Sequence, residues 1–403
     1  MKIIQINNVY SNGSTGKIVA DLHSLYLSSG IDSIVLYGRG QRSKDKRATK
    51  VCSELYSHIN KFFSMISGVM YGGCFLSTNK IIRIIKKEKP DIVHLHCING
   101  YFLNIYRLIN WLKKNRIKTV LTLHAEFIHT ANCGYSFECE KWKTGCGKCP
   151  RLKQVTNSFF IDRTHGSWIK MKKAFSGFDT LIIASVSSWL MNRAKQSPIL
   201  LEHKHCVVTN GLDEDIFHYY DSKELGETYR KQYKHIIFHA TPGFTDDSNH
   251  IKGGYYLIEL AKKMKDSCFL VAGPFKQDIN IPSNVVLLGK ISNQLELAKY
   301  YSLSDLTLLV SKKETFSMIL AESMSCGTPV VGFEAGGPES ITISDYSVFV
   351  EHGNVDKLYE AAVTLLNKKI DKKTISLRAI EKYSKKAMFK SYLSIYNEII
   401  KQN

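Results

Sequence analysis

The segment Glu314-Thr-Phe-Ser-Met-Ile-Leu-Ala-Glu322 decides how this chain is interpreted. The apolar run 306–310 before it predicts a buried strand, and residues 317–326 have the apolar spacing of a helix that stops at Gly327. One carboxylate therefore lies at a strand-to-helix junction, and the other lies about two turns into the helix. The N-terminus of such a helix binds phosphate through its free N–H groups and its macrodipole. The spacing suits a sugar nucleotide, and it equally suits an ordinary β-α-β unit with two solvated glutamates.

The residues after this segment extend the pattern. Pro329 opens a second expected strand at 329–333, and Glu334-Ala-Gly-Gly-Pro-Glu339 follows it. Together with the two glutamates eight residues apart, this run resembles the E-x7-E signature of retaining GT-B glycosyltransferases, specifically glycosyltransferase family 4. The resemblance implies an α/β fold of two Rossmann-like domains that face each other across a cleft. It also implies transfer of a sugar from a nucleotide-sugar donor.

The composition is that of a large folded chain with a basic surface. Its 403 residues exceed one typical core and predict two domains, and 44% hydrophobic with 23% charged residues is ordinary for a globular protein. The net charge of +19 is not ordinary, and it favours nucleic acid, anionic lipid or phosphorylated substrates, or reflects a basic surface with no specific partner. Lys and Arg are spread over the whole length without a basic arm, which disfavours a basic-tail nucleic-acid binder. We expect a membrane-facing or phosphate-binding surface and no nucleic acid.

The sequence shows no sign of export. Residues 1–7 predict a short strand instead of a signal peptide, and no run of about 18 apolar residues indicates a spanning helix. Ten cysteines in such a chain are expected to be reduced thiols. We therefore expect a cytoplasmic protein in peripheral contact with the inner-membrane surface.

Residues 57–87 predict mostly helix, with aromatic and aliphatic residues that give way to basic ones. This pattern indicates either an interfacial membrane surface or a helix packed on the sheet, and we prefer the second interpretation. The residues concerned are Phe62, Phe63, Met65, Ile66, Val69, Met70 and Tyr71, followed by Lys80, Arg83, Lys86 and Lys87.

A glycine-rich turn, Asn12-Gly-Ser-Thr-Gly16, leads from the first expected strand into a helix. It is compatible with phosphate, although it matches neither a P-loop nor a dinucleotide fingerprint. Its glycines either contact a ligand or serve only the backbone geometry of the turn. The family resemblance implies that Gly16 lies beside the donor.

Histidines end the expected strands 91–96 and 118–124, at the edge where parallel sheets bind ligands. A single histidine there usually belongs to the core, but three of them favour a role for one in the site. The resemblance selects His124 as the residue that contacts the donor sugar. The family often has Asp at the next position, where this chain has Ala125, so no role is carried over to that position.

Four cysteines within 17 residues form the most unusual local feature, and they are Cys133, Cys139, Cys146 and Cys149. Four thiolates at this spacing can close a tetrahedral, structural zinc site. The alternatives are a disulfide pair, free thiols or an iron–sulfur cluster. The run 124–150 resembles a cysteine-rich insertion in a subset of family 4 enzymes that build bacterial surface polysaccharides. Those enzymes usually carry Thr-Gly where this chain has Thr130-Ala131.

The turn Asn210-Gly211, with Asp213 and Phe217 after it, resembles the family's domain junction. It predicts an N-terminal acceptor domain over 1–208 with the cysteine insertion at 125–150, a nucleotide-sugar domain over 209–385, and a last helix, 386–403, that returns to the first domain.

The second half of the chain supplies a cation. Lys252-Gly253 precedes an expected helix, and similar enzymes use a Lys-Gly here to neutralise the departing diphosphate. Such enzymes commonly place an Arg upstream, but residues 239–251 contain none. The resemblance further implies that Gly289 borders the nucleotide base.

Together these features predict a retaining hexosyltransferase with a lipid-linked or oligosaccharide acceptor in O-antigen, capsule or exopolysaccharide biosynthesis. The expected catalytic residues are His124, Glu314 and Lys252, and no catalytic metal is expected because cationic and backbone donors stabilise the diphosphate. The expected donor-binding residues are Gly16, Asn210, Gly253, Gly289, Ser317, Met318 and Glu322, the last through the ribose hydroxyls. Three alternatives stay open: a pyridoxal-phosphate phosphorylase on this fold, a zinc-knuckle nucleic-acid-binding protein, and a non-catalytic carbohydrate-binding protein.

Overall fold

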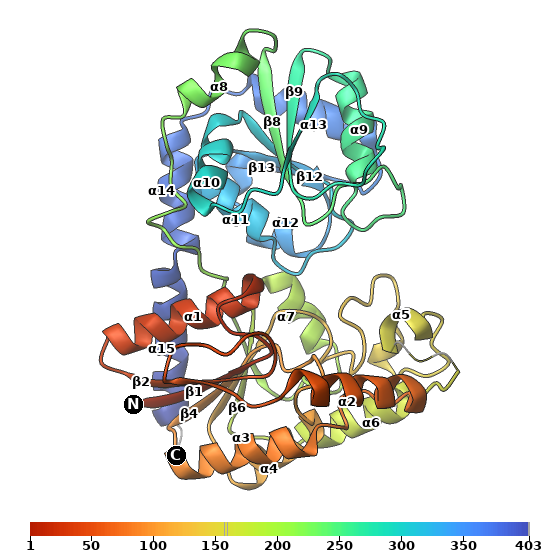
Figure 1. Cartoon of the computed structure of the whole chain (residues 1–403), viewed down its shortest axis with the longest axis vertical. Helices are drawn as coiled ribbons and strands as arrows, with labels where there is room; N and C mark the ends of the chain where they lie inside the picture. Colours follow the sequence, from red (N-terminus) through yellow and green to blue (C-terminus); the bar gives the residue numbers. More distant parts are fainter. Residues whose placement is uncertain (157, 159, 402–403) are drawn as a thin grey trace. The chain divides into compact units, whose positions relative to one another are not determined.

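A computed structural model describes residues 1–156, 158 and 160–401 of the chain. These residues form two compact units (Figure 1): unit 1 is Met1–Val208 with Phe389–Asn403, and unit 2 is Thr209–Met388. Each unit contains one parallel β-sheet flanked by helices, so the expected α/β class is confirmed. The chain enters unit 2 after Val208, and it returns to unit 1 within the last helix, α15 (Lys385–Lys401).

The sheet of unit 1 has seven strands in the order β3-β2-β1-β4-β5-β6-β7. Its central strands are short, almost wholly apolar and buried along their length, as is typical of parallel strands covered on both faces. The strands are β1 (Lys2–Asn7), β2 (Asp32–Tyr37), β3 (Ala48–Lys50), β4 (Ile92–Leu95), β5 (Thr119–Leu123), β6 (Leu181–Ser185) and β7 (Lys204–Val207).

Side chains of the expected capping type begin several helices of unit 1. The Oγ of Ser53, for example, accepts a hydrogen bond from the N–H of Tyr56, and Oδ1 of Asn104 accepts one from Arg107. Besides α15, the helices are α1 (Gly13–Ser28), α2 (Glu54–Ser67), α3 (Phe75–Glu88), α4 (Ile105–Lys114), α5 (Leu152–Thr156), α6 (Thr164–Phe175) and α7 (Ser188–Lys195), with a short 3-10 turn at Lys141–Lys143.

Helix α15 is fixed to unit 1 by buried tyrosines. The hydroxyl of Tyr396 lies 2.9 Å from that of Tyr26 on α1 and 2.6 Å from Nδ1 of His94 on β4. The hydroxyl of Tyr392 lies 2.8 Å from Oγ1 of Thr122 on β5. The end of the chain thus completes the core of the first unit.

The sheet of unit 2 has six parallel strands in the order β10-β9-β8-β11-β12-β13. Its strands are β8 (His235–Ala240), β9 (Ser267–Ala272), β10 (Val285–Gly289), β11 (Leu306–Leu309), β12 (Val330–Phe333) and β13 (Ser347–Val350). Its helices are α8 (Lys223–Arg230), α9 (Gly254–Lys263), α10 (Gln294–Leu303), α11 (Met318–Ser325), α12 (Gly337–Ile341), α13 (Val355–Asn367) and α14 (Lys372–Tyr383), with a 3-10 turn at Ser344–Tyr346.

Several expected boundaries require correction. The edge strands β3 and β13 are not among the strands expected from the sequence, because each is short and only partly buried. The sequence of residues 156–176 predicts one helix, and this prediction is wrong, since α5 ends at Thr156 and α6 begins at Thr164. Positions 157 and 159 of the predicted helix lie outside the described residues. Helix α1 begins at Gly13, so the expected glycine turn is mostly its first turn.

The preferred interpretation of residues 57–87, a helix packed on the sheet, is wrong for α2. This helix contacts the protein through Ser57 and Ser64, whereas Phe62 and Phe63 are 59% and 62% exposed. Small and polar groups make this contact. Oδ1 of Asn60 accepts a hydrogen bond from the Cys74 N–H (2.8 Å), the Ser64 hydroxyl donates to the Val69 carbonyl (2.8 Å), and the Ser57 hydroxyl donates to the Gly100 carbonyl (3.3 Å). None of the helices that the structure describes combines the length and the hydropathy needed to cross a membrane.

Candidate active site

The sheet of unit 2 has a topological switch point between β8 and β11, because the next strands lie on opposite sides of this pair. Ligands of open parallel sheets bind outside the carboxyl ends of the strands at such a point. The loop after β8 carries Lys252, and the loop after β11 carries Glu314. Nζ of Lys252 lies 2.6 Å from Oε1 of Glu314, and both side chains are mostly buried. The structure thus brings two of the expected catalytic residues together at the switch point.

Gly253 sets the position of Lys252. It caps the N-terminus of α9 with a φ of +70°, and a Cβ atom there would lie 2.1 Å from the carbonyl oxygen of Val310, just after β11. Glycine alone permits both this left-handed backbone and this close approach. The N–H of Lys312 also donates to the carbonyl of Ile251 (2.8 Å), so the two loops are joined through their backbones.

The backbone of Glu314 is held by the glycine-rich run that follows β12. The N–H of Glu314 donates to the Ala335 carbonyl (3.0 Å), and the Glu314 carbonyl accepts from the N–H of Gly337 (2.8 Å). A Cβ atom on Gly337 would lie 2.3 Å from the backbone of Thr315, so no larger residue fits. Glu339 stabilises the same glycine-rich run, since both of its carboxylate oxygens accept a hydrogen bond from the N–H of Gly336.

Helix α11 begins at Met318, with Ser317 as its N-cap residue. The Oγ of Ser317 accepts a hydrogen bond from the N–H of Leu320 (3.3 Å), and the first N–H groups of any helix lack an intrahelical acceptor. The φ of Ser317 is +83°, which is costly for a residue other than glycine. Strained residues of this kind concentrate at functional sites, and this one lies three residues after Glu314.

Glu322, inside α11, is oriented by a buried tyrosine. Its Oε2 accepts a hydrogen bond from the hydroxyl of Tyr301 on α10 (3.0 Å). Burial, followed by the charge of Glu322, raises the pKa of Tyr301 well above its usual value, so this tyrosine stays a donor at neutral pH. No local pattern in the sequence points to Tyr301, which lies 21 residues from its partner.

An open pocket of ≈ 900 Å³ lies at the carboxyl ends of β8, β9 and β10. Gly289 is the last residue of β10, and Lys290 and Ile291, directly after it, line the pocket beside Ile319 of α11. The remaining lining residues are Ala240, Thr241, Pro242, Ala272, Gly273, Pro274 and Leu297.

In unit 1, His124 follows β5 and belongs to a cluster of three histidines. Its Nε2 lies 3.3 Å from Nδ1 of His96, whose ring is 3.9 Å from that of His94. Burial lowers the pKa of His124 to about 4, so the imidazole is neutral at physiological pH. Burial and the neighbouring rings lower the pKa values of His94 and His96 well below the usual range. The role expected for His124 at the donor sugar stays a prediction.

The other two expected donor-binding residues, Gly16 and Asn210, lie apart from the Lys252–Glu314 pair in sequence. Gly16 lies in the first turn of α1, where a Cβ atom would meet the side chain of Val9 at 3.1 Å. Asn210 is buried in unit 2, and the adjacent Gly211 would contact Lys385 through a Cβ atom at 2.7 Å. Their contact with a donor also stays a prediction.

The four cysteines of the insertion line one small cavity, together with residues such as Asn132 and Trp142. All of the chain's cysteines are described, and each is a free thiol. Within residues 1–156, 158 and 160–401, no three His, Cys, Asp or Glu side chains are placed closely enough to hold a metal ion. The donor set and the shared cavity suit a four-thiolate zinc site, although the thiols would have to move toward a common centre.

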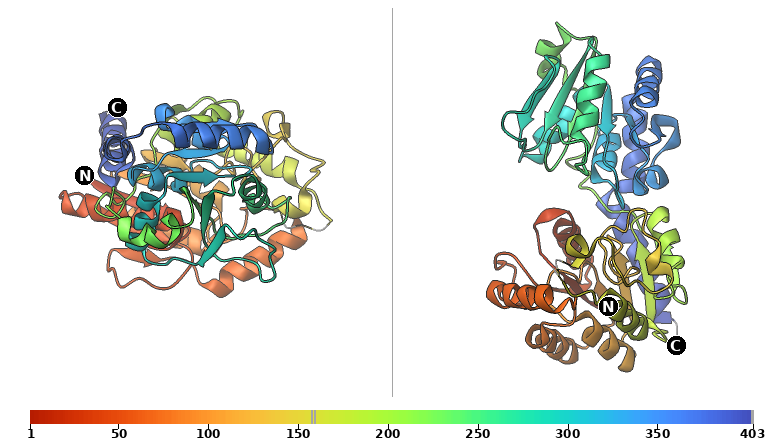
Figure 2. Two further views of the ribbon diagram at one scale, coloured as in Figure 1. Left: turned by 90° about the horizontal axis from the view of Figure 1, so that it is seen from above. Right: turned by 90° about the vertical axis from the view of Figure 1, so that its right-hand side faces the viewer.

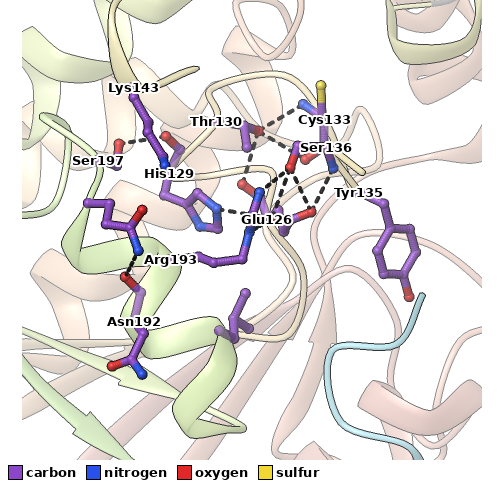
Figure 3. A network of polar contacts seen from close by, with 12 residues as sticks. Glu126, His129, Thr130, Cys133, Tyr135, Ser136, Lys143, Asn192, Arg193 and Ser197 are labelled. Atoms are coloured by element: carbon purple, nitrogen blue, oxygen red, sulfur yellow. Dashed lines mark hydrogen bonds and ion pairs between the residues drawn. The ribbon is translucent and has the colours of Figure 1, made fainter. Parts of the chain in front are cut away.

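A buried carboxylate connects the cysteine insertion to α7 (Figure 3). Glu126 accepts hydrogen bonds from the N–H of Ser136 (2.6 Å) and from Nε of Arg193 (2.5 Å), and Nε2 of His129 lies 3.4 Å away. Burial would raise the pKa of Glu126, but His129, Arg193 and the Ser136 N–H together lower it to about 2. The guanidinium of Arg193 also lies over the ring of Trp142, within the insertion (5.0 Å). Glu126 is therefore a structural anion.

Replacement of Gly253 tests how the Lys252 loop is held. We expect Gly253→Ala to lower the melting temperature by several degrees, because alanine is strained at φ +70° and its Cβ atom would meet the Val310 carbonyl. Gly243→Ala in the same loop is the matched control, since a Cβ atom there meets nothing within 4 Å. Equal melting temperatures for the two variants would contradict this account of the loop.

Two family models match the chain. The model described as Glycosyl transferases group 1 matches residues 243–368, and the model described as Glycosyl transferase 4-like matches residues 51–137. The putative colanic acid biosynthesis glycosyl transferase WcaC of Escherichia coli is 23% identical over 99% of this chain and 100% of its own length. The N-acetyl-alpha-D-glucosaminyl L-malate synthase of Bacillus anthracis is 24% identical over 89% of this chain and 87% of its own.

Solved structures share the fold over the whole chain. The sucrose-phosphate synthase of Thermosynechococcus elongatus has a TM-score of 0.68 at 13% identity, covering 100% of both chains. Alr3699/HepE of Anabaena, in complex with UDP and glucose, has a TM-score of 0.64 at 12% identity, covering 98% of this chain and 99% of its own. The chain is therefore a glycosyltransferase with the GT-B fold, in which a region that matches the Glycosyl transferase 4-like model precedes one that matches the Glycosyl transferases group 1 model.

Proposed function

We propose that the protein is a retaining glycosyltransferase that moves a sugar from a nucleotide-sugar donor to a lipid-linked glycan in the biosynthesis of a bacterial surface polysaccharide. The observation that carries the proposal is the Lys252–Glu314 pair at the switch point of unit 2, next to the strand-end pocket. One relative supports it by its name, a putative colanic acid biosynthesis glycosyl transferase, and one fold neighbour was solved with UDP and glucose.

In this proposal, different groups of unit 2 bind different parts of the donor. The Lys252 ammonium and the N–H groups at the start of α11 stabilise the negative charge that grows on the departing diphosphate. Glu314, whose backbone is fixed on both sides, holds hydroxyls of the donor sugar. Glu322, oriented by Tyr301, accepts the ribose hydroxyls, and the base lies in the pocket beside Lys290. A divalent cation has no role in this scheme.

Removing either member of the ion pair should abolish transfer without unfolding the protein. We expect Lys252→Ala and Glu314→Ala to slow sugar-nucleotide hydrolysis by about 10²–10³-fold, the usual loss when one preorganised group at a developing charge is removed. The measurement is nucleotide release from a panel of sugar nucleotides. Lys263→Ala is the matched control, because its ion pair with Asp356 (2.7 Å) lies elsewhere in unit 2. Near-normal turnover by either test variant would remove that residue from the mechanism.

Retention of configuration is a separate prediction, which rests on the family resemblance and not on the geometry. The product formed with an α-linked donor should carry the new sugar in the α configuration, read from the anomeric proton signals by NMR. A β-linked product would overturn the retaining assignment while leaving the donor site intact.

We also propose that the four-cysteine cavity binds a structural zinc ion. Cys133, Cys139, Cys146 and Cys149 supply four sulfur ligands, which is a closed coordination set with no position left for substrate. The metal would stabilise the insertion that Glu126 and Arg193 hold against α7.

Metal analysis tests the zinc proposal. Protein purified under reducing conditions should contain about one zinc ion per chain by inductively coupled plasma mass spectrometry, as expected for a single four-thiolate site. Cys139→Ser/Cys146→Ser should lose the metal and lower the melting temperature. Cys206→Ser, which replaces a thiol on β7, should keep it. Absence of zinc from the wild-type protein would contradict the proposal.

A further inference from the structure

Helix α2 presents its apolar face to solvent. Leu55, Ile59, Phe62, Phe63 and Ile66 are between 44% and 71% exposed, and their spacing places them on one side of the helix. The opposite side, with the small residues Ser57 and Ser64, is the side that faces the protein. A helix of a globular protein ordinarily buries its apolar stripe, so this reversed orientation indicates that another apolar phase covers α2.

The same surface continues onto α3. The start of α3 contacts α2, since the N–H of Leu76 donates to the hydroxyl of Tyr56 (3.3 Å). Phe75 and Leu76 there are 52% and 71% exposed and extend the apolar patch. Figure 2 shows α2 (orange) at the outer edge of unit 1. We call the seven exposed residues the apolar face; they are Leu55, Ile59, Phe62, Phe63, Ile66, Phe75 and Leu76.

The outer side of α3 changes from apolar to basic along its length. After Phe75 and Leu76 its exposed residues include Lys80, Arg83, Lys86 and Lys87, and its neighbour α4 adds further cations. A groove between α3 and α4 is lined by Arg83, Lys86, Arg107 and Lys114 around Trp111.

The acidic residues of these helices do not offset this charge. α2 and α3 contain one acidic residue each, and α4 contains none. Glu54 is paired with Arg39 (2.7 Å) and Lys50 (2.8 Å), and Glu88 is paired with Lys2 (3.0 Å). The apolar face is therefore bordered by net positive charge.

We propose that the apolar face of α2 and α3 inserts into the interfacial region of an anionic lipid bilayer, with the cations of α3 and α4 against its headgroups. Aromatic and aliphatic residues on one side of a helix beside Lys and Arg are the composition of an interfacial anchor. An anionic bilayer matches both parts of this surface. The phenyl rings would be buried at its acyl boundary, and the lysines and arginines would be attracted by its negatively charged headgroups. The inference rests on the proposed function only in placing the lipid-linked acceptor in that bilayer.

Vesicle binding tests this surface directly. The full-length protein should co-sediment with vesicles of phosphatidylglycerol and phosphatidylcholine more strongly than with phosphatidylcholine alone, and added salt should weaken the binding. Phe62→Ser/Phe63→Ser should weaken partitioning by more than about tenfold, because two exposed phenyl groups that would insert into the bilayer are lost. Lys80→Gln/Arg83→Gln/Lys86→Gln should remove the preference for the anionic vesicles. Leu377→Ser is the matched control, since Leu377 is 70% exposed in unit 2.

A second measurement does not depend on the fold of the serine variant. Phe62→Trp should show a blue-shifted emission on anionic vesicles and quenching by brominated lipids, because the indole would enter the acyl boundary. Sugar-nucleotide hydrolysis in solution should be unchanged in all these variants. Loss of vesicle binding can thereby be distinguished from failure of the proposed glycosyltransferase chemistry.

Three outcomes would overturn the inference. The first is that the wild-type protein does not co-sediment with anionic vesicles at low salt. The second is a wild-type dimer in light scattering that Phe62→Ser/Phe63→Ser converts to a monomer, which would assign the face to a second copy of the chain. The third is salt-sensitive binding of duplex DNA or RNA without vesicle binding, which would assign the cations to nucleic acid.

Discussion

The switch point between β8 and β11 is the constraint on which the site of unit 2 depends. Two strands that lie side by side in the sheet, but 66 residues apart in sequence, send their loops to the same edge, so Lys252 and Glu314 meet at 2.6 Å. Two glycines then fix these loops: Gly253 of the β8 loop packs against the backbone of Val310, and Gly337, in the run after β12, packs against Thr315 of the β11 loop. The ion pair is the consequence of this backbone arrangement.

Unit 1 uses buried polar groups differently. The histidine cluster of His94, His96 and His124 is held neutral by burial, and His94 connects it to the last helix through Tyr396, so these residues are components of a core as well as candidates for a site. Glu126 keeps its charge because Arg193 and the Ser136 N–H compensate for the loss of water. The insertion with the four cysteines therefore has an anchor that does not depend on metal.

Much of this could be predicted because the signals are local. The apolar runs that form strands, the Lys-Gly pair and the two glutamates are each recognisable within a short stretch of sequence. The α/β class follows from the alternation of the expected strands and helices. The roles of Tyr301 and Gly337 could not be predicted, because each acts on a residue more than 20 positions away through packing that no local pattern encodes. The orientation of α2 could not be predicted either, since its amphipathic spacing is the same whichever side faces inward.

The sequence by itself determined the class of fold and the glycosyltransferase identity, because residue types at fixed spacing around a βα junction carry that information. The tertiary structure alone decided which of those residues meet, because contact between two loops depends on strand order in the sheet. It also decided that the aromatic stripe of α2 faces outward, because Asn60 and Ser64 on the opposite side hydrogen-bond to the backbone of the turn at 68–74, and Ser57 hydrogen-bonds to the Gly100 carbonyl.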